Sequence, residues 1–150
     1  MDENKIKEFF IKGLESLFDL DKHYFSKIII YNTVVDDIID FAKANHPKEF
    51  VAFFHGMIED KRFIIDSLVY NEFRSNENSA APIFHFADKS FYGSVHSHPG
   101  HSNRPSRADR QFFMKTGIIH AIICVPFRKE NIAFYNMDGE SIEVEIQPDE

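Results

Sequence analysis

The sequence contains no tryptophan and one cysteine, and none of its apolar runs approaches the roughly 18 residues that a membrane-spanning helix needs. A single cysteine excludes a disulfide framework within one chain. Because Cys124 lies in the apolar run 118–127, we expect it to be a buried, inert thiol. The first ten residues are charged and lack the apolar core of a secretion signal. We therefore expect a cytoplasmic protein with no membrane partner.

Positive charge is also scarce. The chain has 17 Lys and Arg against 24 Asp and Glu, a formal net charge of -7, and no stretch of it is strongly basic. Proteins that bind DNA or RNA neutralise phosphates with clustered lysines and arginines. The charge balance therefore predicts that nucleic acid is not a partner.

What the sequence does contain is typical of one soluble domain. Its 150 residues are 43% hydrophobic and 27% charged, which fits a single globular unit and excludes two full-sized ones. Phenylalanine is abundant, with 17 Phe beside 5 Tyr. A core built largely from phenylalanine rings is expected.

An amphipathic pattern near the start predicts a helix over residues 5–18. Its apolar stripe can pack on the domain's own sheet or form the contact of a homodimer, and the pattern alone leaves both open. Binding at a membrane surface is disfavoured because the polar face is not rich in Lys and Arg. The stripe consists of Ile6, Phe9, Phe10, Gly13, Leu14, Leu17 and Phe18.

Two further helices are indicated. Thr33 and Asp36 form a Thr-x-x-Asp start signal, and Pro47 ends that helix near Asn45. Its inward residues are Val35, Ile38, Ile39 and Ala42. The other helix is predicted from about Ser106 to Thr116, closing at Gly117.

Strands account for most of the remaining chain. A polar turn at residues 59–61 predicts one hairpin, and Asp138-Gly139 predicts another. Residues 71–90 form the longest irregular segment. The order of elements predicts an α/β fold, layered in the α+β manner, with helices flanking a mixed, largely antiparallel sheet. The predicted strands are 27–31, 50–57, 62–70, 91–96, 118–127, 131–137 and 140–146.

The most informative stretch is HSHPGHSNRPSRAD, residues 96–109. His96 and His98, two residues apart at the end of a strand, project to the same side. Asp109, in the first turn of the following helix, can fold back towards them. Two imidazoles and a carboxylate suit Zn²⁺, and three protein ligands leave a fourth position for water.

Each part of this stretch also has a simpler interpretation. Ser106-x-x-Asp109 after Pro105 is a capping-box pattern, and a His-x-His pair at the mouth of a loop is often only a polar surface feature. The interpretations are compatible for Asp109, because a helix start fixes the orientation that a metal ligand needs.

Residues 96–109, together with Glu49 of Pro47-x-Glu49, resemble the signature of the JAMM (MPN+) metalloprotease family, here in a small prokaryotic-type member. That signature is a distant Glu, then His-x-His, ten residues and Asp, with Ser three positions before the Asp. The resemblance covers about residues 25–146. It implies an MPN/cytidine-deaminase-like fold for residues 25–150 and leaves residues 1–24 as an N-terminal helical extension.

The resemblance also implies roles for the matching residues. His96, His98 and Asp109 would bind one Zn²⁺ per chain, Glu49 would transfer protons, and Ser106 would stabilise the oxyanion. Alone, an acidic residue just before a strand is usually a solvated surface carboxylate, and the Pro-x-Glu context before an apolar strand favours the catalytic interpretation of Glu49. The histidines interpreted as loop, structural or surface residues are His101, His23, His46, His55, His85 and His120.

The substrates that the resemblance implies are peptide or isopeptide bonds at the C-terminus of ubiquitin-like modifiers or sulfur-carrier proteins. A Gly-Gly tail could pair as an extended strand beside residues 71–90. The alternatives are a non-catalytic MPN-type scaffold, a metal-dependent amidohydrolase acting on small substrates, and a DNA-repair-associated relative, which the acidic charge disfavours.

Overall fold

The computed structural model describes residues 3–6, 27–70 and 91–150. Residues 3–6 are helical, and the rest of the amphipathic pattern lies outside the described residues, as does the irregular segment 71–90. The elements are, in chain order, β1 (Lys27–Tyr31), α2 (Asn32–Asn45), β2 (Val51–Glu59), β3 (Arg62–Val69), β4 (Phe91–Ser97), α3 (Arg107–Thr116), β5 (Ile119–Ile123), the 3-10 turn η1 (Lys129–Asn131), β6 (Ile132–Asn136) and β7 (Glu145–Gln147).

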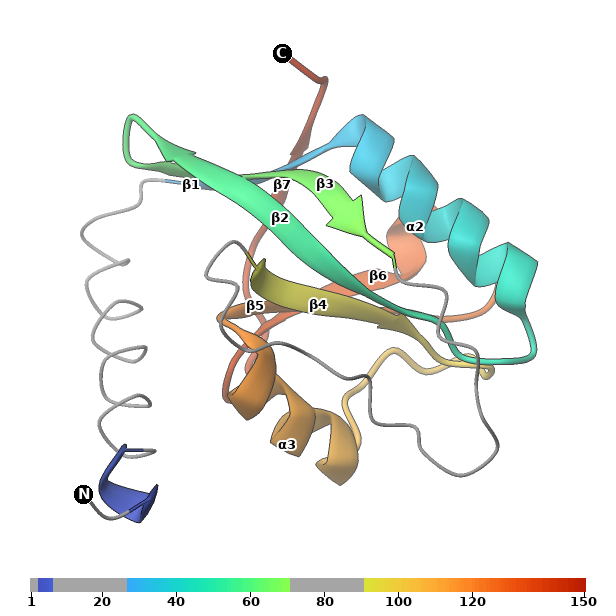
Figure 1. The fold of residues 1–150 in the computed structure, drawn as a ribbon. Helices are drawn as coiled ribbons and strands as arrows, with labels where there is room; N and C mark the ends of the chain where they lie inside the picture. Colours follow the sequence, from blue (N-terminus) through green and yellow to red (C-terminus); the bar gives the residue numbers. More distant parts are fainter. Residues whose placement is uncertain (1–2, 7–26, 71–90) are drawn as a thin grey trace.

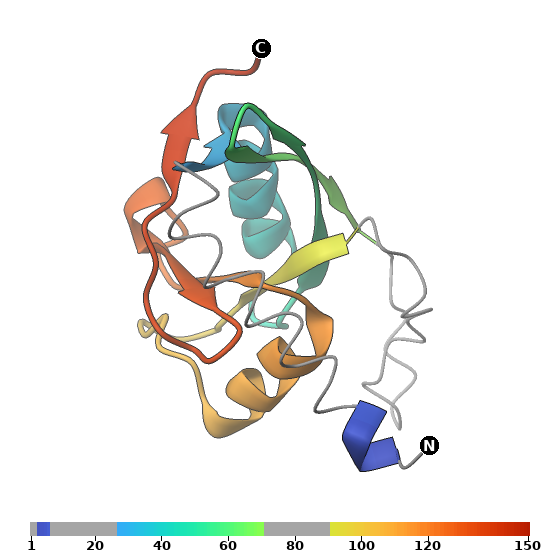
Figure 2. The ribbon, with the colours of Figure 1, turned by 90° about the vertical axis from the view of Figure 1, so that its left-hand side faces the viewer.

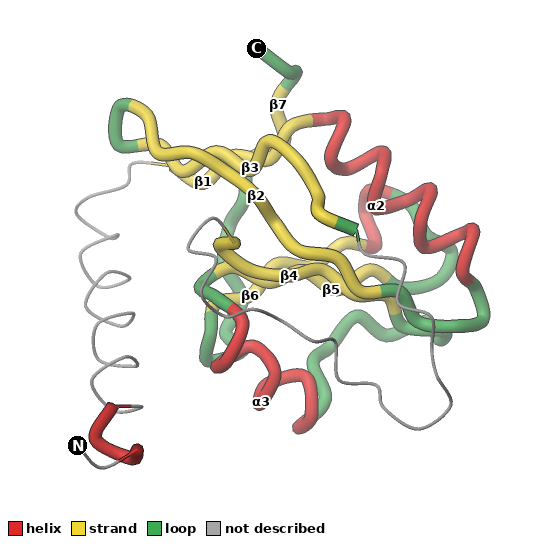
Figure 3. The backbone as a smooth tube through the Cα atoms, viewed as in Figure 1, coloured by secondary structure: helices red, strands yellow, loops and turns green. Residues whose placement is uncertain are grey.

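The strands form one mixed sheet in the order β6-β5-β4-β2-β3-β1-β7. Neighbours β1–β3, β1–β7 and β4–β5 are parallel, and β2–β3, β2–β4 and β5–β6 are antiparallel. Helices α2 and α3 lie on opposite faces of this sheet (Figures 1 and 3). The layered fold with helices flanking a mixed sheet is therefore confirmed, with parallel and antiparallel pairings equally represented among the described strands.

Each helix buries an apolar face against the sheet. The α2 side chains Val34, Val35, Ile38 and Ala42 belong to the main core, together with the fully buried β1 isoleucines. Phe113 of α3 forms a second, smaller cluster on the other face. All five residues of β5 are buried. Cys124 is buried as predicted, and burial raises the pKa of its thiol, which keeps it unreactive.

The predicted start of α2 was wrong. The helix begins at Asn32, and its N-cap Tyr31 offers no side-chain cap. Thr33 lies inside the helix, where its backbone N–H and its hydroxyl donate to the Asp149 carboxylate at 3.2 and 2.5 Å. The local pattern predicted that Asp36 would accept the hydrogen bond of the Thr33 N–H. The acceptor is instead a carboxylate 116 residues away. The predicted end at Asn45 is confirmed.

One of the two predicted hairpins is confirmed over its full length, and the other is confirmed only beside its turn. β2 and β3 pair as expected, and the turn between them holds Asp60 and Lys61 at positive φ. Asp138-Gly139 also forms a turn, and its arms pair over a short stretch: Asn136 N–H donates to the Glu140 carbonyl at 2.9 Å and Ile142 N–H donates to the Phe134 carbonyl at 3.0 Å, around the bridge between Tyr135 and Ser141. Residues 145–147 instead pair in parallel with β1 at the opposite edge of the sheet (Figure 2).

The reason for this second difference is packing. The apolar residues of the predicted strand 140–146 pack against the main core, and main-chain bonds to β6 are made only by the residues nearest the turn, Glu140 and Ile142. The segment therefore crosses to the other edge of the sheet. The residues concerned are Ile142, Val144 and Ile146.

Close backbone approach requires glycine at the start of β4. A Cβ on Gly93 would lie 1.5 Å from the carbonyl oxygen of its β5 partner Ile119. Gly117, which ends α3, has φ of 134° and packs closely against the backbone of Tyr92 and Gly93.

Within the described ranges, the helices are too short or too polar to cross a membrane.

Candidate metal centre

The end of β4 and the start of α3 meet at one point beside the sheet. His96 is the penultimate residue of β4 and is 4% exposed, and His98 follows directly after the strand. The N–H of His98 donates to the Ile123 carbonyl at 2.8 Å, and the N–H of Val125 donates to Gly100 at 2.9 Å. The loop after β4 is thus held against the end of β5.

The three predicted ligands converge. Nε2 of His96 lies 3.1 Å from Oδ1 of Asp109, and Nε2 of His98 lies 3.0 Å from Oδ2 of the same carboxylate. The two Nε2 atoms are 3.2 Å apart. One ligand atom from each residue therefore lies within 4.8 Å of the others, so the group can hold a metal ion.

The His98 ring is oriented as a metal ligand would be. Nδ1 lies 2.8 Å from the carbonyl oxygen of Ser102, which can only accept a hydrogen bond. Nδ1 therefore carries a proton, which leaves Nε2, the atom that faces the Asp109 carboxylate, as the nitrogen that can bind a cation. A cation between this nitrogen and the carboxylate oxygens would be held by both. A ring nitrogen bonded to a backbone carbonyl is also the usual support of a metal-ligating histidine.

Asp109 is fixed by the start of α3. Its N–H donates to Oγ of Ser106 at 3.0 Å, and the Ser106 N–H donates to Asp109 Oδ2 at 2.8 Å, so the predicted capping box is present. Burial would raise the pKa of Asp109, but hydrogen bonds with His96 and with the Ser106 N–H outweigh it and hold that pKa well below its usual range. The carboxylate is therefore ionised, as a ligand must be.

Glu49 and Ser106 border the same pocket as two of the three ligands, His98 and Asp109. This pocket has a volume of about 480 Å³. Glu49 is exposed to solvent, in keeping with its position at the rim. The lining residues include Glu49, His98, His101, Ser102, Ser106 and Asp109.

The position of Glu49 depends on how β2 pairs with β4. Directly after it, the Phe50 N–H donates to Oγ of Ser97 at 2.9 Å, and the Ser97 N–H donates to the Phe50 carbonyl at 3.1 Å. Val51 then pairs with His96 in the antiparallel ladder. A distant glutamate is thus brought beside the histidines by main-chain pairing.

A buried polar pair lies beneath the centre. The Ser94 hydroxyl and Nδ1 of His120 are 2.7 Å apart, and Nε2 of His120 donates to the Gly117 carbonyl at 2.9 Å. The Phe113 ring stacks on His120 at 4.3 Å and lies 6.1 Å from the His96 ring. Burial lowers the pKa of His120 to about 3, so the ring is neutral. Its interpretation as a structural histidine agrees with these contacts.

Sequence reasoning missed three supporting residues, Tyr135, Asn103 and Ser94. The Tyr135 hydroxyl donates to the Asn103 carbonyl at 2.7 Å, and the Asn103 amide donates to the Asn131 carbonyl at 3.1 Å. These bonds tie the ligand loop to the end of the sheet near β6. Ser94, the partner of His120, lies two residues before His96 and therefore on the same face of the strand. This spacing was the only feature of the sequence that could have drawn attention to it.

Comparisons with known proteins agree with this architecture. The family model of prokaryotic homologs of the JAB domain matches residues 32–138. A solved structure described as "JAMM: A Metalloprotease-like Zinc Site in the Proteasome and Signalosome" is 30% identical, with a TM-score of 0.64 over 81% of this chain and 99% of that one. No curated protein matches the chain.

Two further structures extend the comparison. AF2198, a JAB1/MPN domain protein from Archaeoglobus fulgidus, is 32% identical, with a TM-score of 0.63 over 79% of this chain and 97% of that one. Protein DSY2949 from Desulfitobacterium hafniense, at 15% identity and a TM-score of 0.57 over 81% of this chain and 94% of that one, shares the fold. With the family model spanning most of the sequence and the His-His-Asp group assembled, the chain belongs to the prokaryotic JAB (JAMM/MPN) domain family.

Proposed function

We propose that this protein is a zinc-dependent metalloprotease. Its substrates are peptide or isopeptide bonds at the C-terminus of ubiquitin-like modifier or sulfur-carrier proteins. The observation that carries this proposal is the convergence of two histidine Nε2 atoms and one carboxylate within 4.8 Å, beside a pocket that also contains Glu49 and Ser106.

In this proposal His96, His98 and Asp109 hold the metal. Two of them are oriented by other hydrogen bonds: His98 by its bond to the Ser102 carbonyl, and Asp109 by the capping box, which uses Oδ2 and leaves Oδ1 directed at His96. Zn²⁺ bound here would lower the pKa of a coordinated water from 15.7 towards about 7 and polarise a substrate carbonyl. Two imidazoles and a carboxylate are a donor set of catalytic zinc sites.

Glu49 and Ser106 supply the proton transfer and the oxyanion contact. The Glu49 carboxylate takes a proton from the attacking water and returns it to the nitrogen of the leaving amine. The Ser106 oxygen already accepts from the Asp109 N–H, so its own O–H remains to donate to the substrate carbonyl oxygen as negative charge develops there. Water is the nucleophile, and no acyl-enzyme forms.

A Gly-Gly tail suits this pocket. Glycine residues carry no side chain, so the substrate backbone can approach the ligand loop closely and place its last carbonyl beside Ser106. Such a tail can reach the pocket while the folded body of the substrate stays outside it.

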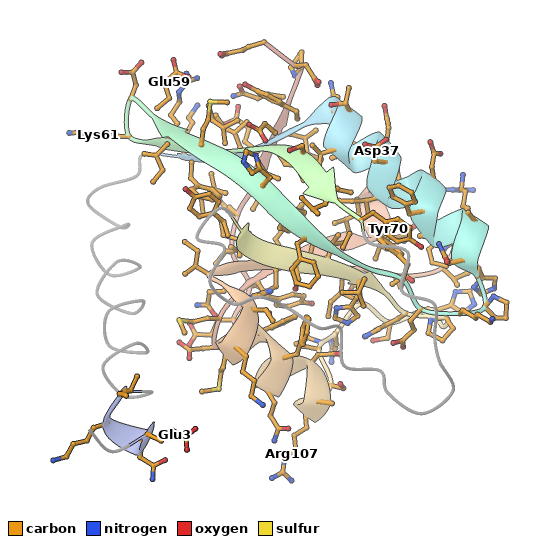
Figure 4. All side chains as sticks on the ribbon, in the orientation of Figure 1. Glu3, Asp37, Glu59, Lys61, Tyr70 and Arg107 are labelled. Atoms are coloured by element: carbon orange, nitrogen blue, oxygen red, sulfur yellow. The ribbon has the colours of Figure 1, made fainter. Side chains whose placement is uncertain are left out.

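The test is cleavage of a ubiquitin-like protein whose Gly-Gly terminus is fused to a reporter peptide. Zinc-loaded wild type should cleave after the second glycine, and chelation should abolish cleavage. Glu49→Ala should lower kcat by about 10²–10⁴ while zinc content stays stoichiometric. Glu59→Ala, at the exposed tip of the β2–β3 hairpin, is the matched control and should behave as wild type (Figure 4).

Two outcomes would overturn the proposal. Cleavage by Glu49→Ala at the wild-type rate would show that Glu49 is not the general base. A purified protein that binds no zinc, yet binds partners equally well with Glu49→Gln, would instead be a scaffold.

A further inference from the structure

The charged residues of this acidic chain are distributed unequally over the two helices that flank the sheet. Helix α2 carries three aspartates and one lysine, whereas α3 carries two arginines and one lysine besides Asp109, which is turned towards the histidines. Asp37 on α2 and Arg107 on α3 lie on opposite sides of the sheet (Figure 4). The helix beside the metal centre is therefore positive in a chain whose net charge is -7.

The exposed residues of α3 form a continuous surface. Arg107, Arg110 and Met114 recur at helical spacing on one side, and Asp109 and Phe113 occupy the other. Met114 is 43% exposed. We call the exposed set the cationic face: Arg104, Arg107, Arg110, Gln111, Met114 and Lys115.

The charges of this face are not neutralised by the part of the chain that the structure describes. The ion pairs there involve Lys27, Arg62 and histidines, and none includes a cation of this face. Exposed arginines and a flexible methionine are typical of protein-binding surfaces.

The cationic face begins at the rim of the pocket. Ser106 and Ala108 line the pocket, and Arg107 lies between them in the sequence. The same helical turn thus directs Asp109 to the metal centre and Arg107 outwards. A body bound to this face would be adjacent to a tail entering the pocket.

We propose that the cationic face docks the acidic surface of a folded protein substrate while the substrate's C-terminal tail occupies the pocket. This inference rests on the proposed hydrolytic function, which requires a partner that presents a peptide bond. Nucleic acid is a poor occupant because the chain as a whole is acidic and would repel a polyanion. A compact acidic patch on a folded protein can bind this one face without contacting the acidic remainder of the chain.

The test uses two ubiquitin-fold proteins with the same Gly-Gly tail and reporter, one strongly acidic and one neutralised by Asp→Asn and Glu→Gln changes. Zinc-loaded wild type should show a higher kcat/KM for the acidic protein, and that advantage should shrink as ionic strength rises. Arg107→Glu/Arg110→Glu should lower kcat/KM for the acidic protein about tenfold or more, with kcat at saturation unchanged.

The matched control is Lys43→Glu/Lys129→Glu, which changes the net charge equally but lies outside α3. It should retain the preference for the acidic protein. Because the Arg110 side chain packs over Gly139, Arg107→Glu alone is included as a milder change. A short peptide amide with the Gly-Gly tail but no folded body should be cleaved equally by wild type and all three variants.

Equal kcat/KM for the acidic and neutral proteins would overturn the inference, and so would equal losses in the two double variants. If wild type cleaves neither protein nor peptide, the hydrolytic function fails. Docking is then decided by titration calorimetry of the acidic protein into zinc-loaded Glu49→Gln, with and without Arg107→Glu. Binding that is unaffected by Arg107→Glu would contradict docking at the cationic face.

Discussion

Ser106 and Asp109 hold each other at the start of α3: each backbone N–H donates to the side chain of the other, at 2.8 and 3.0 Å. The pair therefore caps a helix and aims a carboxylate at two histidines at once. Helix stability and the position of a metal ligand depend on the same atoms, and substitutions at Ser106 can separate the cap from the catalytic role of the hydroxyl.

Ser106→Ala should lower the free energy of unfolding by about 1 kcal/mol through loss of the cap. It should also lower kcat by about 10²–10³ through loss of the hydroxyl donor. Ser106→Thr should preserve both properties, while Ser106→Asp should keep the cap and lose activity. Thermal unfolding and peptide cleavage measure the two effects, and full activity in Ser106→Asp would refute the oxyanion role.

Zinc should stabilise the fold through His98. At a free zinc concentration about 100-fold above Kd, the free energy of unfolding should rise by about 2.7 kcal/mol. For a chain of this size, Tm should then increase by roughly 5–10 °C. His98→Ala should abolish that increase, whereas His101→Ala should retain it, because His101 lines the pocket without belonging to the ligand group. Calorimetric scans at several zinc concentrations provide the measurement.

Acid should destabilise the protein through His120. Its pKa of about 3 in the fold, against an ordinary 6.5, is caused by burial and opposed by the bond to the Gly117 carbonyl. The unfolded chain therefore binds the proton more readily. Stability from this group is complete above about pH 6.5 and is lost as the pH falls towards 3.

The expected loss from His120 is roughly 3 kcal/mol between about pH 7 and pH 4. His120→Gln cannot titrate and retains groups that can bond Ser94 and Gly117, so its stability should fall less steeply. Urea unfolding of chelator-treated protein removes any contribution from metal release. Parallel curves for wild type and His120→Gln would exclude His120 as the source.

Gly93→Ala should be among the most damaging changes in the sheet. The added Cβ would lie 1.5 Å from the Ile119 carbonyl oxygen, so β4 and β5 must separate. A loss of at least roughly 3 kcal/mol is expected. Gly100→Ala is the control, because a Cβ there meets nothing within 4 Å. Urea unfolding compares the two, and similar midpoints would contradict the close approach.

The sequence was informative where its signals are local. The capping pattern at Ser106, the glycine at 117 and the His-x-His spacing predicted α3 and the ligand group, because all of these lie within one strand-loop-helix unit. The same capping logic was wrong at Thr33, whose hydroxyl is engaged by Asp149 from the far end of the chain. A local pattern contains no information about such a distant partner.

Pairing between distant strands was equally inaccessible. The alternation in residues 140–146 and the Asp138-Gly139 turn favoured one long hairpin, but only the residues nearest the turn stay beside β6, and residues 145–147 pair with β1. The placement of Glu49 beside the histidines likewise depends on the β2–β4 ladder, and only the family resemblance drew attention to it. Alternation specifies which face of a strand is buried and leaves its neighbour open.

The irregularity in strand pairing at His55 and Gly56 divides the long β2 strand into two parts that pair with different neighbours. β4 pairs with β2 over Val51–His55, and beyond the bulge the described neighbour of β2 is β3 alone, so the hairpin tip projects past β4 (Figure 1). Lengthening the tip leaves the spacing between Glu49 and His96 unchanged. This outer half is therefore where the scaffold can accept inserted recognition loops or engineered tags while its chemistry stays in register.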